Sequence, residues 1–143
     1  MPTSEVGAGE ADLGALLARL LPRLAAAEEP ILAVAGLSMW EYAIMSELAS
    51  GAVVSQTDLS RRTGRDPTRL GRHLDDLRER GLVAREQASD RRRRSVRLTA
   101  EGERLYGEVK AQVRSAEDEL LHARLTASEA ARLRQLLARL TEE

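Results

Sequence analysis

The sequence contains no cysteine and no phenylalanine among its 143 residues. The lack of cysteine excludes disulfides, thiolate metal sites and thiol redox switches. Aromatic residues make up only 2% of the chain, so we expect a core of leucine, alanine and valine. No long apolar run occurs either: the longest, Ile31 to Ala35, is far shorter than the roughly 20 residues that span a bilayer. The first residues lack the features of a secretory signal, so we expect a cytoplasmic protein with no membrane partner.

Charge is distributed unevenly, although the formal net charge is only −1. Between Ser55 and Thr99 there are 13 arginines against 7 acidic residues, which gives +6, whereas the remainder holds 9 basic and 16 acidic residues, which gives −7. The densest stretch, from Ser89 to Thr99, contains five arginines. Because a basic segment attracts polyanions, this part of the chain is expected to carry the function.

Spacing and capping signals predict a chain that is mostly helical. Leucines at helical intervals predict a first helix from Glu10 to about Ala27, which Pro22 should kink or interrupt, and Pro30 marks the next boundary. A capping box of Ser38 and Glu41 predicts a second helix, which runs to about Ser50.

Two short helices joined by a glycine predict a helix-turn-helix. The first starts at Ser55 and stops at Gly64, and the second starts at Asp66-Pro67 and closes at Gly81. Two short strands follow, at residues 82–86 and 95–98, and form the hairpin called a wing. The inward face of the second short helix carries three leucines: Leu70, Leu74 and Leu77. After the wing, Thr99 caps the start of a long helix, and Thr126 caps the start of the last helix.

This order of elements, together with several local motifs, resembles the MarR family of winged-helix transcription regulators over about residues 13–140. Asp90-Arg91-Arg92, followed by Leu98-Thr99 and then Gly102, is similar to the family's D-R-R…L-T-x-x-G signature. Residues 77–83 are similar to its L-e-x-x-G-l-v junction, and Gly36-Leu37-Ser38 is similar to its G-L-T entry to the second helix. Residues 39–42, Met-Trp-Glu-Tyr, look like a variant found in actinobacterial members.

The resemblance implies a mainly α (α+β) fold, a winged helix-turn-helix with N- and C-terminal dimerisation helices, compact as a single domain. We expect a flexible tail at residues 1–9, an N-terminal dimerisation helix region at 10–36, a DNA-binding lobe at 37–99 and C-terminal dimerisation helices at 100–143. The leucine stripes of the first and last helices exceed what one small lobe can cover, although burial within one chain is the alternative. The expected partners are a second copy of the chain and a pseudo-palindromic double-stranded DNA site.

Helix-turn-helix geometry brings the N-terminal part of the second short helix to base edges in the major groove. We therefore expect DNA contacts from five of its residues and from the start of the preceding helix: Thr68, Arg69, Gly71, Arg72, His73; Ser55, Gln56, Thr57. Gly71 costs about 1 kcal/mol in a helix interior, and we expect its missing side chain to permit close approach of DNA.

The wing is expected to place arginines in the minor groove, as the resemblance implies. The candidates are Arg91, Arg92, Arg93 and Arg94, with Arg92 and Arg93 at the tip. Asp90 is expected to brace the loop, and Asp75 to pair with a wing arginine, either Arg91 or Arg94. A merely soluble loop is the alternative.

Trp40 and Met39 are candidates for a ligand cleft. Members of the resembled family hold small aromatic or phenolic effectors between the dimerisation helices and the DNA-binding lobe, although Trp40 as plain packing is equally compatible with the sequence. The two histidines, His73 and His122, are isolated, so we expect no metal site and no cofactor. The chain carries no nucleotide-binding or catalytic motif, so we expect no enzyme.

The functional hypothesis is therefore a homodimeric, sequence-specific DNA-binding regulator, a repressor that a small ligand releases. The alternative is a winged-helix protein-interaction module that binds an acidic protein partner without specific DNA recognition. Basic residues at the wing tip separate the two, because only the duplex requires them.

Overall fold

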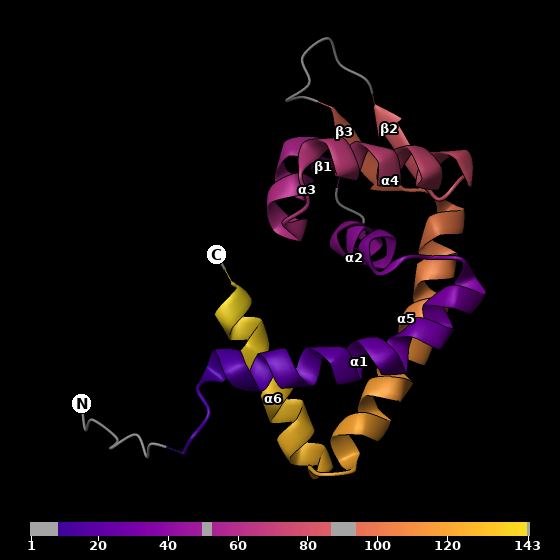
Figure 1. Cartoon of the computed structure of the whole chain (residues 1–143). Helices are drawn as coiled ribbons and strands as arrows, with labels where there is room; N and C mark the ends of the chain where they lie inside the picture. Colours follow the sequence, from indigo (N-terminus) through magenta and orange to yellow (C-terminus); the bar gives the residue numbers. More distant parts are fainter. Residues whose placement is uncertain (1–8, 50–52, 87–93, 143) are drawn as a thin grey trace.

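The computed structural model describes residues 9–49, 53–86 and 94–142, and within them the chain is mainly helical with one small sheet. Figure 1 shows a lobe above, made by α2, α3, α4 and the strands, and the helices α1, α5 and α6 below it. The fold class expected from the sequence is confirmed. In chain order the elements are α1 (Leu13–Ala35), α2 (Met39–Leu48), β1 (Val54–Ser55), α3 (Gln56–Thr63), α4 (Pro67–Glu79), β2 (Val83–Glu86), β3 (Ser95–Leu98), α5 (Ala100–His122) and α6 (Ala127–Thr141).

Several expectations fall on residues outside the described ranges. They concern the tail up to residue 8, the brace Asp90, and the wing residues Arg91, Arg92 and Arg93. The expected division at residues 36/37 and 99/100 stays a prediction; α1 ends and α5 begins beside those two points.

The helix starts follow the predicted caps. Ser38 and Thr126 form reciprocal capping boxes with Glu41 and Glu129. The side chains of Ser55, Asp66 and Thr99 each accept a hydrogen bond from the backbone N–H three residues later. These bonds satisfy N–H groups that have no partner within the helix.

The sheet joins the wing to the start of the helix-turn-helix. Its strand order is β1-β3-β2, all antiparallel, with Val54 opposite Val96 and Val83 opposite Leu98. These four side chains are buried beside the inward leucines of α4, and this packing holds α4 against the sheet: Leu70, Leu74, Leu77.

The expected break in the first helix is wrong, because α1 continues through Pro22 and Pro30 to Ala35. Each interior proline removes one backbone hydrogen bond and costs about 3 kcal/mol in a helix. The packing of α1 against α5, where the two helices cross (Figure 1), offsets that cost, and Leu32 of α1 is buried in the common core. The helix ends at Gly36, whose φ of 70° is readily adopted by glycine.

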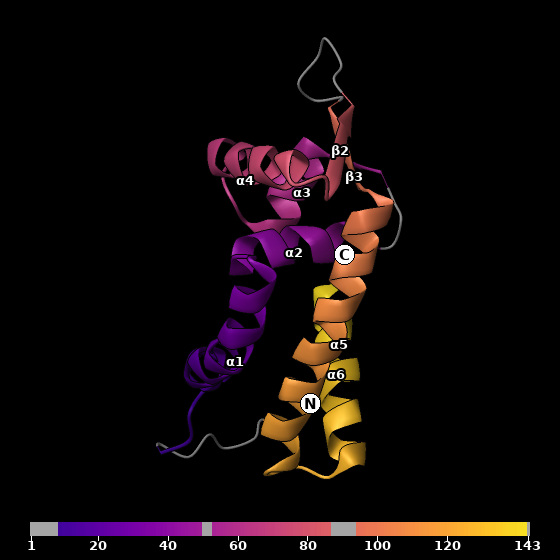
Figure 2. The same ribbon diagram turned by 90° about the vertical axis from the view of Figure 1, so that its right-hand side faces the viewer.

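The lower helices leave a row of leucines uncovered by this chain. Figure 2 shows α5 and α6 side by side, with α1 on the left; α1 contacts α5. Leu13 of α1 is 59% exposed and Leu140 of α6 is 72% exposed; Leu16, Leu21, Leu136 and Leu137 are exposed as well. The leucine stripes are therefore only partly used within one chain. Among the described residues, no single helix is long and apolar enough to span a membrane; α1 and α2 together reach the necessary length and composition, but they are bent by 83°.

Candidate DNA-binding surface

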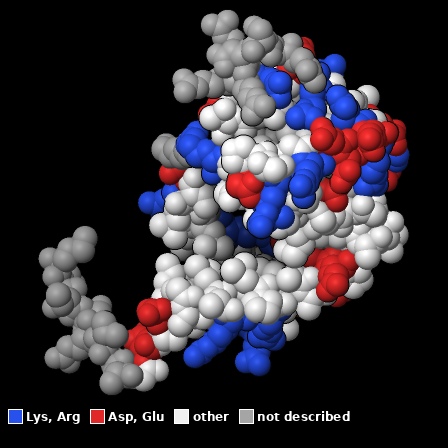
Figure 3. Space-filling model, turned by 45° about the horizontal axis from the view of Figure 1, so that its top comes forward, with Lys and Arg blue, Asp and Glu red and all other residues white. Residues whose placement is uncertain are grey.

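A groove runs between α3, α4 and the base of the wing. Its volume is about 390 Å³. Its lining includes seven of the residues expected either to contact DNA or to brace the wing: Gln56, Thr57, Thr68, Gly71, Arg72, Asp75 and Arg94. Figure 3 shows Lys and Arg side chains spread over this upper lobe, with Asp and Glu side chains gathered beside them at its right-hand end. The structure thus brings together residues that the sequence separates by nearly forty positions.

The second helix of the helix-turn-helix, α4, is called the recognition helix below. It buries a row of leucines on one face and exposes polar residues on the other. Thr68 and Arg72 are exposed and line the groove, with Gly71 between them. Asp66 caps the helix by accepting the Arg69 N–H at 3.0 Å. This hydrogen bond, helped by the Arg69 charge, holds the pKa of Asp66 below its usual value, so the cap stays ionised.

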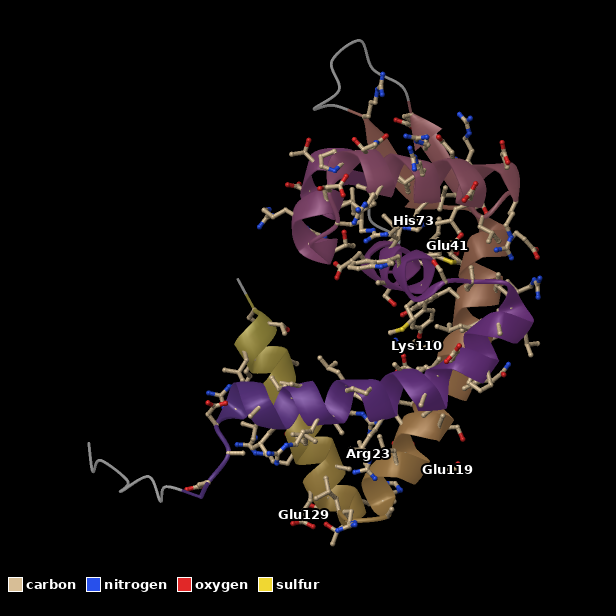
Figure 4. All side chains as sticks on the ribbon, viewed as in Figure 1. Arg23, Glu41, His73, Lys110, Glu119 and Glu129 are labelled. Carbon is tan, nitrogen blue, oxygen red and sulfur yellow. The ribbon has the colours of Figure 1, made fainter. Side chains whose placement is uncertain are left out.

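Two residues of α4 that were expected to contact DNA lie outside the groove lining. The Nε of Arg69 is 3.4 Å from Asp66 Oδ2, and both side chains are more than half exposed. His73 is half-buried, and Figure 4 places it on the side of α4 that is nearer α2. Base contacts from these two residues stay predictions.

Arg85 of β2 links α4 to α3, a contact that the sequence did not predict. Its Nη1 pairs with Asp75 of α4, and its Nε and Nη2 donate to Gln56 Oε1 of α3 at 3.3 and 3.1 Å. The described partner of Asp75 is thus Arg85, an arginine of the first wing strand, rather than the expected Arg94, and the expected pairing with Arg91 lies outside the described residues. The Arg85 side chain is only 10% exposed, since strand alternation puts it on the same side of the sheet as the buried Val83. That alternation is the signal that could have found it.

The start of α3 is tied to the base of the wing. The Ser55 hydroxyl caps α3 by accepting the Asp58 N–H at 3.1 Å, and the Gln56 N–H donates to the Arg94 carbonyl at 2.9 Å. Thr57 is exposed and lines the groove. Of the three expected contacts at the start of α3, Ser55 and Gln56 therefore have structural partners within the lobe, and Thr57 faces the groove.

The comparisons with known proteins agree with this geometry. A family model described as MarR family matches residues 35–94. The crystal structure of the Mycobacterium tuberculosis MarR family protein Rv2887 with salicylic acid is 31% identical, covers 94% of this chain and 99% of that one, and has a TM-score of 0.73. The chain belongs to the MarR family.

Two further crystal structures extend the likeness between this MarR-family chain and known regulators. NadR in complex with 4-hydroxyphenylacetate is 29% identical, with 99% of each chain covered and a TM-score of 0.76. Rv2887 in complex with DNA is 28% identical, with 93% of this chain and 100% of that one covered and a TM-score of 0.76. The winged helix expected from the motifs is confirmed. Among the described residues, no three His, Asp or Glu side chains are grouped so that they could hold a metal ion.

The expected ligand residues of this MarR-family chain separate in the structure. Met39 and Leu32 line two hollows between α1 and α2, of about 360 and 300 Å³. Trp40 lines neither of them: it is 38% exposed, and the Arg65 guanidinium lies 4.3 Å from its ring centroid. Trp40 thus packs against the turn of the helix-turn-helix, whereas Met39 keeps a position from which it could meet a ligand. A ligand contact from either residue stays a prediction.

Two carboxyl groups meet where α1 crosses α5. Burial, a hydrogen bond with Glu117 and the charge of Glu117 raise the pKa of Glu28 to about 7. The hydroxyl of Tyr42 faces the same cluster, and its ring stacks on Tyr106 with centroids 5.5 Å apart. Arg134 of α6 pairs with Glu117 at 3.4 Å. The pair therefore holds a proton near neutral pH that solvent-exposed carboxyls would release.

We predict that Glu28 makes the protein less stable as pH rises from about 4.5 to 7. In this window the unfolded chain loses the proton while the folded protein keeps it, so ionisation favours unfolding. Because Glu28 is only half-buried, solvent screening reduces the effect to about 1 kcal/mol. Urea unfolding at pH 5 and pH 7.5, at equal protein concentration, should show that Glu28→Gln stabilises the protein more at the higher pH. The exposed neighbour gives the control, Glu29→Gln, and an equal pH response of both variants contradicts the prediction.

Proposed function

We propose that this protein is a homodimeric, sequence-specific DNA-binding regulator of transcription. It works in the cytoplasm, as a repressor that a small aromatic or phenolic ligand releases from DNA. One observation carries the proposal: Thr68, Gly71 and Arg72 of the N-terminal half of α4 line the groove together, and the side chains of Thr68 and Arg72 are exposed. The crystal structure of Rv2887 with DNA supports the same function for this chain.

The recognition helix reads the major groove in this proposal. Arg72 can donate two hydrogen bonds to a guanine, and Thr68 can contact either a base edge or a phosphate. Arg69 is exposed at the start of α4 and adds a phosphate contact, whereas His73, half-buried toward α2 (Figure 4), is the weakest of the expected contacts. Arg94 stands at the base of the wing, and Arg91 to Arg93, which come just before it in the sequence, are the minor-groove contacts of this proposal.

The dimer uses the leucines that one chain leaves exposed on α1 and α6. Full burial of an exposed leucine is worth roughly 1.5–3 kcal/mol, and each of these leucines can gain the part that corresponds to its exposed fraction, so together they favour association. A two-fold axis through these helices sets two recognition helices about 34–36 Å apart, one turn of DNA. This geometry requires a pseudo-palindromic site.

The ligand enters one of the hollows between α1 and α2. The relatives crystallised with salicylic acid and 4-hydroxyphenylacetate support an aromatic or phenolic compound. Both hollows are lined by Leu32 of α1 and Met39 of α2. A ligand bound there therefore pushes α1, which we call the arm, away from the DNA-binding lobe. The spacing of the two recognition helices then no longer fits successive major grooves.

The dependence of DNA binding on salt tests the proposal. With three or four phosphates contacted per subunit, log K should fall with log salt at a slope of about −5 to −7 for the dimer. Titration of a duplex selected by the protein from a random-sequence pool, at several salt concentrations, measures this slope. Light scattering on the same sample gives the mass. A flat salt response contradicts DNA binding and favours the alternative, an acidic protein partner. A monomeric mass contradicts the two-fold dimer.

A further inference from the structure

The C-terminal end of the recognition helix α4 is hydrogen-bonded to the C-terminal end of α1. Arg80 donates from Nη1 to the Gly36 carbonyl at 2.7 Å and from Nη2 to the Ala35 carbonyl at 3.0 Å. The backbone of Arg80 is helical and its N–H donates to Asp76, so the side chain starts from the last turn of α4 itself. Figure 1 shows both helix ends on the right-hand side, where they flank the beginning of α5.

The contact fits the electrostatics of the end of α1. The last carbonyls of a helix carry a partial negative charge and favour a cation, yet α1 has no basic residue in its own last turn. The carbonyls of Leu32 and Ala33 are satisfied by the N–H groups of Leu37 and Gly36. Arg80 donates to the carbonyls of Ala35 and Gly36 with a charged fork, which is stronger and more directional than a neutral hydrogen bond.

Glycine at position 36 permits the turn at which the contact is made. Its φ of +70° turns the chain from α1 into the lobe, and a Cβ there would lie 3.4 Å from Arg80 Nη2. The guanidinium therefore lies directly against the backbone of the turn. The contact joins positions 44 and 45 residues apart in the chain, and it bridges the arm and the DNA-binding lobe without passing through the core.

We propose that Arg80 is a positioning residue for DNA recognition, which couples the orientation of α4 to the end of α1 and so to the arm that lines the ligand hollows. This inference rests on the proposed function. Because α1 forms one wall of both hollows, a shift of its last turn is transmitted to α4 by two hydrogen bonds. Linkage makes the coupling reciprocal, so DNA bound to α4 should in turn stabilise the end of α1.

The first test compares the affinity of Arg80 variants for a duplex that the wild-type protein selects from a random-sequence pool. We expect Arg80→Ala to weaken binding about tenfold at fixed salt, a magnitude typical of residues that carry coupling. The salt slope should not change, because a residue that touches no phosphate releases no counterion. Arg124→Ala is the matched control: it removes the same charge from an exposed arginine beyond the end of α5 and should leave the affinity unchanged.

The second test follows the end of α1 directly by hydrogen exchange. In the wild-type protein, DNA should slow exchange of the Gly36 and Leu37 amides, whose N–H groups close the last turn of α1. In Arg80→Ala this protection by DNA should disappear, while amides in the middle of α4 stay protected as in the wild type. Arg80→Lys keeps the charge but loses the fork, and it should show an intermediate response. If Arg80→Ala does not fold, Arg80→Lys decides the test.

The outcomes separate this inference from the proposed function. Unchanged affinity and unchanged protection at Gly36 and Leu37 in folded Arg80 variants overturn the inference and leave DNA binding intact. A salt slope reduced by about 1 per subunit also overturns it, since Arg80 would then be a phosphate contact. Failure of the wild-type protein to bind any selected duplex overturns both.

Discussion

Gly102→Ala should destabilise the protein by about 3 kcal/mol or more and lower the melting temperature by roughly 10 °C. A Cβ at this position would lie 2.0 Å from the Leu82 carbonyl oxygen and 3.2 Å from Leu98 Cδ2. The first obstacle is backbone and cannot rotate away. That carbonyl also accepts the Thr99 N–H at 3.1 Å, so relieving the clash breaks the joint between α5 and the lobe.

The same helix offers the control for this prediction. Gly107 is also interior to α5, but a Cβ there meets no atom within 4 Å. Gly107→Ala should therefore stabilise the protein by up to about 1 kcal/mol, as expected for glycine to alanine in a helix. Thermal and urea unfolding of the two variants measure the contrast. Equal stabilities would show that α5 can move away from Leu82 at little cost.

The fold could be predicted where the signal is local. Ser38 and Glu41 lie three residues apart and satisfy each other's backbone groups, so the start of α2 is readable without knowledge of anything else. The continuity of α1 through Pro22 and Pro30 is different, because it depends on packing along α5 some eighty residues later in the chain. Tertiary contacts outweigh the local cost of the prolines there.

The site was predicted in its residue types more completely than in its pairings. The groove contains Thr68, Gly71 and Arg72, as helix-turn-helix geometry requires. The partner of Asp75 depends on which strand lies beside α4 and on its register, and the sequence offered several arginines of equal charge. Arg85 lies two residues after Val83 in β2, so both side chains are on the same face of the sheet, and Arg85 reaches Asp75 of the helix. The Arg80 contact with α1 spans too much sequence for any local pattern to indicate it.

Gly71→Ala should raise stability and lower DNA affinity at the same time. A Cβ on Gly71 meets no protein atom within 4 Å, so alanine should gain up to about 1 kcal/mol for the helix. The added methyl group projects into the groove between Thr68 and Arg72, where DNA is expected to approach. Loss of one or two close contacts should weaken binding about 10- to 100-fold.

The opposite signs of these two effects are what make Gly71 informative. A substitution that only damages the fold lowers stability and affinity together, and Gly107→Ala should raise stability with no change in DNA binding. Melting temperature and duplex affinity, measured on the same samples, therefore separate a DNA-facing glycine from a structural one. If Gly71→Ala binds DNA as tightly as the wild-type protein, the duplex does not approach this part of α4, and the recognition surface must be shifted toward Arg69 and the wing.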